Sequence, residues 1–411
     1  MWLLLRGRHG SFEMAESLAA VQSRASRRSH FRWVWLVLAA LAIAAAAGVL
    51  IDQVVFAPAA SGPQQILDAL VSGPHRVAPG ATAYVSGPNG TWIGAAGIAN
   101  LKTEEPMQAD TRLRIQSNSK TWLLTVALQL VQEGKLNLAD TVSHWLPGLL
   151  PYGNQITLLA LMTDTSGLID DNDITRSASA GKTMLTRVKD PKLRAQLVAT
   201  AARLHANPAT PASPMLYIRL AAWQPLLFAP GTHYHHSNIG WNIAGLIVER
   251  AAGQSLPVLY RERIFKPLGL AHTTYAPQGP IPGPHAEGYL IARNGSLTDA
   301  TPWTYGKGAD GAIVSDAADE ATFLRALIDD RLHVRDAFLF FVHPSGWTPA
   351  KGGCPGNPIE GVGTGSASRS YVYFATTGNR VAVLLLNGDR EATGAYDPKA
   401  EAAAASLYCG A

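Results

Sequence analysis

The 19 residues from Trp33 to Ile51, "WVWLVLAALAIAAAAGVLI", carry no charged side chain. A helix of about 20 apolar residues can cross the hydrocarbon core of a bilayer. A buried helix of a globular domain normally keeps a polar face, which this run lacks. The run therefore predicts a membrane segment at 33–51, preceded by a basic N-terminus at 1–32 and followed by the rest of the chain.

Arginines gather just before the predicted membrane segment, at Arg24, Arg27, Arg28 and Arg32. Basic residues stay on the cytoplasmic side, so residues after Ile51 are expected to be exported. The length of the apolar run favours an uncleaved single-pass anchor in the cell membrane. The alternative is a signal peptide cleaved near the small residues of "FAPAAS", which would release a secreted protein.

The composition is that of a globular protein, with 47% hydrophobic and 16% charged residues among 411. The net charge of +4 does not recur as a basic stripe, which argues against a nucleic-acid partner. Two cysteines occur, Cys354 and Cys409, and in an exported chain they favour an intrachain disulfide. The alternative is a pair of separate buried thiols. The sequence has no C-x-x-C motif, so a cysteine metal site is not expected.

The pattern after the membrane segment predicts a linker at 52–65 and one domain at 66–411. Alternating residues at 81–85 and 91–98 flank an Asn-Gly turn, which predicts a β-hairpin, and "SYVYFATTGNRVAVLLLNG" predicts a second one. Helical spacing is found downstream of residue 117 and at 154–163, 242–252 and 400–408. The sequence therefore predicts an α+β fold, with an antiparallel sheet built from both ends of the exported chain, flanking helices and a mostly helical middle.

A serine and a lysine three residues apart stand at the start of the first of these helices, in "SNSK". At this spacing the Ser117 hydroxyl and the Lys120 amine lie one turn apart on one face, so the amine can take the hydroxyl's proton. The free N–H groups of a helix N-terminus also favour an oxyanion there. Many solvated helix starts contain the same pair as an N-cap, so the spacing alone is a weak signal.

The stretch around this pair, "TRLRIQSNSKTWLLTVALQLVQEGKLNLADTVSHWLPG", resembles the nucleophile region of the serine β-lactamase and penicillin-recognising DD-peptidase superfamily. The branch it resembles holds class C β-lactamases and D-alanyl-D-alanine carboxypeptidases. Matches continue in order with "ITLLALMTDTSGL", "APGTHYHHSNIGWNIAGLIVERAAG", "IFKPLGLAHTTY" and "GADGAIVSDAADEATFLRALI", although Asp164 stands where the family usually has a histidine. The resemblance spans residues 79–388. It implies a β-lactamase/transpeptidase-like fold, Ser117 as nucleophile, Lys120 as its general base, and no cofactor.

The family's second motif, Tyr-x-Asn, falls on residues 236–238 by this resemblance. His236 takes the place of the tyrosine, and Asn238 is the asparagine that holds the substrate's amide. An imidazole can do acid and base work, because its ordinary pKa of about 6.5 suits neutral pH. His233 and His235 are expected to be loop or surface residues. A zinc site is the alternative for this cluster, but no H-E-x-x-H helix is present and adjacent histidines rarely face one ion.

The third motif departs furthest from the family, in "EGVGTGSASRSYVYF". Family members carry Lys-Thr-Gly or His-x-Gly on a strand beside the nucleophile, where the cation binds a substrate carboxylate. Here the cation position falls on Val362 or Gly363, depending on the register, and neither is basic. Unless Arg369 or another cation replaces it, the loss costs about 1.5–3 kcal/mol for a carboxylate-bearing substrate, a roughly tenfold to hundredfold penalty.

The Thr-Gly character of the third motif survives in Thr364 and Gly365, which are expected to bind substrate. The backbone N–H of Gly365 or Ser366 can complete an oxyanion hole with that of Ser117. The sequence therefore predicts an exported serine hydrolase, of the β-lactamase or D-Ala-D-Ala carboxypeptidase type, or an esterase because the cation is missing. Its partners would be a small-molecule or peptidoglycan-peptide substrate and the membrane. The alternative is a non-catalytic cell-surface binding or scaffold module with the same fold.

Overall fold

The computed structural model describes residues 62–171, 173, 191, 194–195, 198, 213–277, 280–292, 294–304, 308–341, 348–349, 354–356, 358–365, 367–377, 379–390 and 397–411. The chain divides into two compact units, Met1–Ala59 and Ala60–Ala411, and the described residues belong to the second. Within them, no helix is long and apolar enough to cross a membrane. The predicted membrane segment at 33–51 lies outside the described residues.

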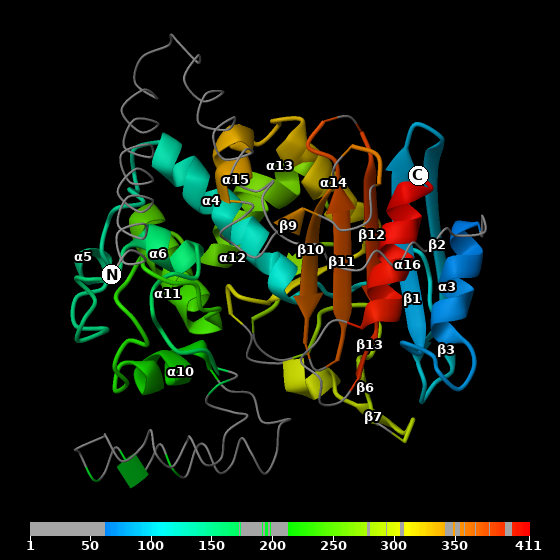
Figure 1. Cartoon of the computed structure of the whole chain (residues 1–411), viewed down its shortest axis with the longest axis horizontal. Coiled ribbons are helices and arrows are strands. Elements are labelled where there is room, and N and C mark those ends of the chain that lie inside the picture. The colour runs from blue at the N-terminus through cyan, green and yellow to red at the C-terminus, as the bar shows by residue number, and fades with distance from the viewer. Residues whose placement is uncertain are drawn as a thin grey trace, which may run out of the picture. The chain divides into compact units, whose positions relative to one another are not determined.

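An antiparallel sheet joins the two ends of this unit (Figure 1). Its strands run in the order β3-β2-β1-β12-β11-β10-β9. They are β1 (Gly80–Gly87), β2 (Gly90–Asn100), β3 (Glu105–Pro106), β9 (Thr348–Pro349), β10 (Ile359–Thr364), β11 (Arg369–Phe374) and β12 (Val381–Leu386). The central pairing sets β1 against β12, with Ala83 opposite Leu384. Both predicted hairpins, β1 with β2 and β11 with β12, are confirmed, as is the sheet built from both chain ends.

Side-chain alternation gives the sheet two apolar faces. On one face, Tyr371, Tyr373 and Leu384 pack in a core with helices α3 (Pro63–Val71) and α16 (Pro398–Cys409). The opposite face of β1 and β12 is covered by α14 (Ala317–Ile328). Since successive strand residues point to opposite faces, a sheet buried on both sides reads as a continuous apolar run, as "VAVLLL" of β12 does.

The middle of the chain is mostly helical, as predicted. Helix α4 packs against α11, which also contacts α6 and α10. The helices are α4 (Ser119–Gln132), α5 (Val142–Trp145), α6 (Leu158–Met162), α10 (Pro214–Ala221), α11 (Asn238–Ala252), α12 (Leu256–Tyr260), a π-helical turn (Arg261–Phe265), α13 (Lys266–Leu268) and α15 (Arg335–Phe341). The smaller strands are β4 (Leu113–Arg114), β5 (Thr274–Tyr275), β6 (Tyr289–Ile291), β7 (Leu297–Asp299), β8 (Ile313–Ser315) and β13 (Gly388–Arg390), and a 3-10 turn spans Thr301–Thr304.

Several helix boundaries differ from the predictions for local reasons. Helix α6 begins at Leu158 rather than residue 154, because the Thr157 side chain accepts a hydrogen bond from Ala160 N. Helix α11 begins four residues earlier than predicted, after the cap residue Ser237. Helix α3 occupies the end of the predicted linker, because Pro63 fits the first helical turn and Leu67 is buried against the sheet.

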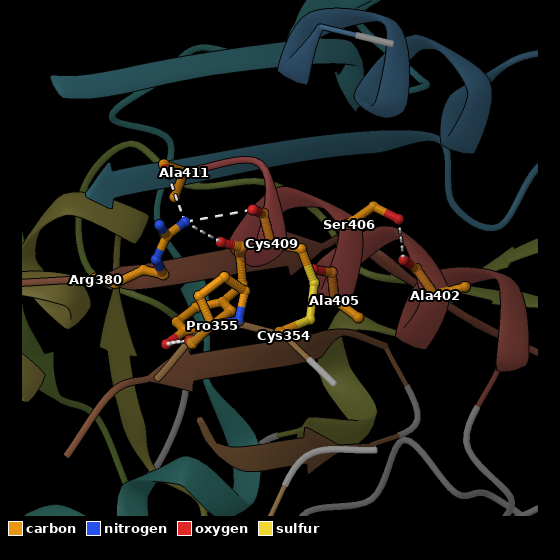
Figure 2. Close-up of a disulfide and its surroundings, with 9 residues drawn as sticks. Cys354, Pro355, Arg380, Ala402, Ala405, Ser406, Cys409 and Ala411 are labelled. Atoms are coloured by element: carbon orange, nitrogen blue, oxygen red, sulfur yellow. Dashed lines mark hydrogen bonds between the residues drawn. A yellow bond between two sulfur atoms is a disulfide. The ribbon is translucent and has the colours of Figure 1, made fainter. Parts of the chain in front are cut away.

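A disulfide fastens the last helix to the chain segment before β10. Cys354 is bonded to Cys409, as predicted, with Cα atoms 5.2 Å apart. Figure 2 shows Arg380 beside the bridge, donating to the carbonyl oxygens of Tyr408, Cys409 and Ala411 at the end of α16. Closing a loop of 55 residues stabilises the fold by about 4 kcal/mol on the chain-entropy model.

Candidate active site

The Ser117 hydroxyl lies in a 3-10 turn, Gln116–Asn118, that leads directly into α4. Two side-chain hydrogen bonds hold the turn against β11 and the residue before it. Gln116 Nε2 donates to Ser368 Oγ, just before β11, and Asn118 Nδ2 donates to Ser370 Oγ in β11, each at 2.8 Å. Gln116 adopts a left-handed conformation with φ of 52°. This backbone is uncommon for a residue with a side chain, so the neighbouring contacts hold the turn that presents Ser117.

Lys120 lies one helical turn further on, with Nζ 2.8 Å from Ser117 Oγ. It is buried, with 5% of its surface exposed. Its amine also donates to Asn238 Oδ1 at 2.9 Å and to the carbonyl oxygen of Asp310 at 3.3 Å. The structure thus brings the predicted nucleophile, the predicted base and the second-motif asparagine together.

Asn238 is placed by the start of α11 and by an acidic loop. The Ser237 hydroxyl caps the helix by accepting from Gly240 N. Asp170 Oδ1 accepts from Asn238 N at 2.8 Å, and Asp171 Oδ1 accepts from Asn238 Nδ2 at 2.9 Å. A carboxylate can only accept here, so it fixes the amide orientation and turns Oδ1 towards Lys120.

The histidines of "HYHHSN" bond to separate partners. His233 Nδ1 meets Thr232 Oγ1 at 2.9 Å, His235 Nε2 meets Asp173 Oδ2 at 3.0 Å, and His236 Nδ1 meets Asp164 Oδ2 at 3.3 Å. In the part of the chain that the structure describes, no three metal-ligating side chains gather into a cluster. His236 makes no hydrogen bond to Ser117 or Lys120 among the described residues, so its predicted role depends on reaching the substrate.

The third-motif strand approaches the nucleophile so closely that only glycine fits. A Cβ at Gly363 would overlap the carbonyl oxygen of Ile115 and lie 3.1 Å from Ser117 N. Val362 instead packs against the core on the other side of the sheet. Between the two registers left open by the sequence, the position facing the nucleophile is therefore Gly363. Thr364 is exposed, and a Cβ at Gly365 would overlap the amide of Gln116; Ser366 lies outside the described residues.

We expect Gly363→Ala to lower kcat/KM for an ester by at least tenfold. The added methyl group must push β10 away from backbone atoms that cannot yield, and such overpacking costs about 1–3 kcal/mol. Gly240→Ala is the matched control, because the nearest atom to its added Cβ is 3.6 Å away. Steady-state ester hydrolysis and thermal unfolding measure both effects. Equal activity of the two variants would contradict the close approach.

Arg369, named above as a replacement for the missing cation, does not face the nucleophile. Its Nε donates to Asp389 Oδ1 at 2.7 Å, its Nη2 also bonds to this oxygen, and its Nη1 meets the Tyr371 hydroxyl at 3.4 Å. The next residue, Ser370, bonds to Ile115 O on the nucleophile side. Because neighbouring strand residues point to opposite faces, Arg369 lies on the far side.

The sequence model of the beta-lactamase family matches residues 64–406, a range that includes every residue placed at this site. The chain belongs to the beta-lactamase family. Its α+β architecture and its Ser-x-x-Lys pair agree with membership of this family of serine hydrolases.

Individual relatives of this beta-lactamase family member are distant. Protein Rv1367c of Mycobacterium tuberculosis is 25% identical over 245 residues, which cover 58% of this chain and 59% of that protein. Esterase EstB of Burkholderia gladioli is 30% identical over 181 residues, 43% of this chain and 41% of the esterase. The chain thus spans about half the length of these curated relatives. The D-amino acid amidase of Ochrobactrum anthropi SV3, solved with L-phenylalanine amide, shares the fold, with a TM-score of 0.64, 21% identity, and coverage of 84% of this chain and 96% of that chain.

The family motifs do not reveal the acidic residues around this site. Asp170 and Asp171 hold Asn238, and Asp310 contributes its carbonyl oxygen to Lys120. The signal for two of them was the acidic run "DDND" directly after the "TSGLI" stretch. On α10, burial raises the pKa of Tyr217 well above the ordinary phenol value, and the charges of Asp171 and Asp310 add to the shift. The Tyr217 hydroxyl therefore stays protonated near the site.

Proposed function

We propose that this chain is a serine hydrolase that forms an acyl-enzyme on Ser117 and acts on small neutral esters or amides. The observation that carries the proposal is the 2.8 Å contact between Lys120 Nζ and Ser117 Oγ at a buried helix start. A serine that only caps a solvated helix start is not expected to contact a buried lysine. Here the lysine also donates to two further acceptors inside the protein.

Lys120 is arranged to act as a base rather than as a charge partner. Asn238 Oδ1 and the carbonyl oxygen of Asp310 both only accept hydrogen bonds from Nζ. We infer that the amine acts in its neutral form, with its lone pair turned towards Ser117 Oγ. As Oγ bonds to the acyl carbon, its proton passes to Lys120 and from there to the departing alcohol or amine.

The oxyanion formed in this step needs donors aimed at the acyl oxygen. Ser117 N lies at the start of the helix, and β10 runs beside it, within 3.1 Å of where a Cβ of Gly363 would stand. We assign the hole to the N–H groups of Ser117 and Gly365, with Thr364 lining the substrate's path. Because Gly363 has no side chain, β10 lies close enough to Ser117 for the two N–H groups to form one hole.

Neutral substrates suit the site because the third-motif cation is absent. Gly363 cannot carry a side chain without moving β10, and Arg369 is bound to Asp389 on the other face. A substrate carboxylate would therefore lose a charge-assisted contact, which is worth about 1.5–3 kcal/mol. The partial similarity to Esterase EstB supports an ester among the substrates.

His236 is proposed as the acid/base group that serves the water in deacylation. It stands two residues before Asn238, and its side chain is 42% exposed. An imidazole in this place can reach a bound substrate without a direct hydrogen bond to Ser117.

The location of the enzyme rests on the sequence. We propose that residues 33–51 anchor the protein in the cell membrane, with the hydrolase domain outside the cytoplasm. The Cys354–Cys409 disulfide supports this proposal, because disulfides persist in oxidising compartments.

A matched pair of esters tests the proposed function. 4-Nitrophenyl butyrate and the mono-4-nitrophenyl ester of succinic acid have similar size and the same leaving group, but only the second carries a carboxylate. We expect kcat/KM to be at least tenfold higher for the butyrate, and Ser117→Ala to reduce both rates to background. A preference for the succinate would refute the neutral-substrate proposal. Absence of turnover at any pH from 5 to 9, together with binding of peptidoglycan fragments, would favour the non-catalytic alternative.

A further inference from the structure

Asp164 lies buried behind His236, in the position where the sequence departs from the family's histidine. Its side chain is 2% exposed, and its backbone adopts a left-handed conformation with φ of 53°. Its carbonyl oxygen accepts from His235 N at 2.8 Å. The residue therefore holds the backbone before the second motif as well as one of its side chains.

We propose that Asp164 is a positioning residue that holds His236 with its proton on Nδ1, so that Nε2 is left as the base for the water that deacylates Ser117. The inference rests on the proposed function, because it assigns one step of that reaction. It adds a carboxylate–imidazole pair to the Ser-Lys pair, in which Lys120 serves acylation and His236 serves deacylation.

The two carboxylate oxygens of Asp164 make hydrogen bonds to different partners. Oδ1 accepts from Ser237 N at 3.1 Å and from Trp241 Nε1 at 3.2 Å. A backbone amide and an indole can only donate, so Oδ1 must remain an acceptor. These two bonds fix the carboxyl plane and direct Oδ2 towards His236 Nδ1, 3.3 Å away.

The tautomer of His236 follows from this arrangement. An ionised carboxylate has no hydrogen to give, so Nδ1 must carry the proton and donate it. The neutral imidazole then has its lone pair on Nε2, the ring edge away from Asp164, and the His236 side chain as a whole is 42% exposed.

The step balances as follows. The oxygen of a water molecule bonds to the acyl carbon while one of its protons passes to His236 Nε2. The bond between the acyl carbon and Ser117 Oγ then breaks, and Oγ takes that proton back from the imidazolium. The products are a carboxylic acid and the free enzyme. Asp164 keeps its charge throughout and stabilises the transient imidazolium.

Asp164→Asn separates the positioning role from the structural one. The amide oxygen can still accept from Ser237 and Trp241, while the amide nitrogen meets His236 Nδ1 as a donor and forces the proton onto Nε2. Left-handed backbone is tolerated by asparagine. We expect the melting temperature to stay near that of the parent and kcat for 4-nitrophenyl butyrate to fall by about 10²-fold or more. The pre-steady-state burst should keep its amplitude of one equivalent and change its rate by less than about threefold.

Three comparisons make the test specific. Asp164→Ala removes the acceptor of both obligate donors, so it should also lower the melting temperature. Asp173→Asn alters the neighbouring pair, His235 with Asp173, and should leave kcat unchanged. His236→Asn should reproduce the loss of Asp164→Asn, and the double variant should lose little more, because residues acting through one group are not additive.

The tautomer itself can be read without turnover. Nitrogen-15 NMR of histidine-labelled protein at pH 9, with His236 assigned by His236→Asn, should show the proton on Nδ1 in the parent and on Nε2 in Asp164→Asn. An unchanged tautomer, or an equal loss of burst rate and kcat, would overturn the proposal. If the parent never acylates, the proposed function fails, and the NMR result alone decides whether Asp164 sets the His236 tautomer.

Discussion

We expect Lys120→Met to lower the rate of Ser117 acylation by about 10²–10⁴-fold, the range for loss of a general base or acid. Lys120 is 5% exposed, and methionine keeps much of its side-chain volume there. A thioether is not basic, so it cannot take the serine proton. It also leaves Asn238 Oδ1 and the carbonyl oxygen of Asp310 without their donor. The burst phase of an activated ester measures acylation directly.

Two further variants separate the base from the buried hydrogen bonds. Lys120→Arg restores hydrogen-bond donors, but a guanidinium stays protonated and cannot act as a base, so it should be nearly as slow as Lys120→Met. Lys135→Met removes an exposed lysine that pairs with Glu133 and should leave the burst unchanged. Recovery of the burst rate in Lys120→Arg would contradict the role of Lys120 as a base.

We expect the free energy of unfolding of the parent to fall between about pH 4.5 and pH 8, and Glu320→Gln to abolish this fall. Glu320 lies in α14, fully buried beside the Trp122 indole, and neither oxygen has a hydrogen bond of good geometry among the described residues. Burial raises the pKa of its carboxyl by more than this indole lowers it. Burial, helped by the charge of Asp319, raises the pKa of its carboxyl to about 8. The native state therefore keeps a proton that the unfolded chain releases near pH 4.5.

The sign follows from proton binding. Between pH 4.5 and 8 the native state binds more protons than the unfolded state, so the free energy of unfolding falls as the pH rises and levels off above 8. A shift of this size corresponds to about 5 kcal/mol. Glu320→Gln cannot titrate, so its advantage over the parent should grow by up to that amount from pH 4.5 to 8.5. Urea unfolding across this range measures it.

Glu401→Gln, on the half-buried side of α16, controls for the loss of one carboxylate. It should follow the parent curve at every pH. Parallel curves for the parent and Glu320→Gln would show that Glu320 does not hold the proton in the folded protein.

Local sequence patterns were sufficient to predict four strands of the sheet, β1, β2, β11 and β12. The turn residues and the alternation around them predict the hairpin without distant information. The observed pairing of Gly87 with Gly90 places the turn on Pro88 and Asn89, one residue before the predicted Asn89-Gly90 turn. The choice between Val362 and Gly363 needed the structure. A shift of one residue turns every side chain of a strand to the other face. Only the packing of β10 against the turn Gln116–Asn118, and of Val362 against the core, shows which face is which.

Some residues of the candidate site could likewise be predicted from the sequence, and others needed the structure. Ser117, Lys120 and Asn238 could be predicted because each lies in a motif with fixed spacing, and their meeting depends on α4 packing against α11. The partner of His236 could not be predicted from spacing. Asp164 reaches it through a left-handed turn and two further hydrogen bonds, which depend on how loops distant in sequence pack together.

The central claim, an acyl-enzyme on Ser117 made with the help of Lys120, is tested most directly by mass spectrometry. The parent and Ser117→Ala are mixed with excess 4-nitrophenyl butyrate, quenched in acid within the first turnover, and digested. The account predicts one butyryl group on the peptide containing Ser117 in the parent and none in Ser117→Ala. An unmodified Ser117 peptide, or the same butyryl group on another residue in both proteins, would contradict it.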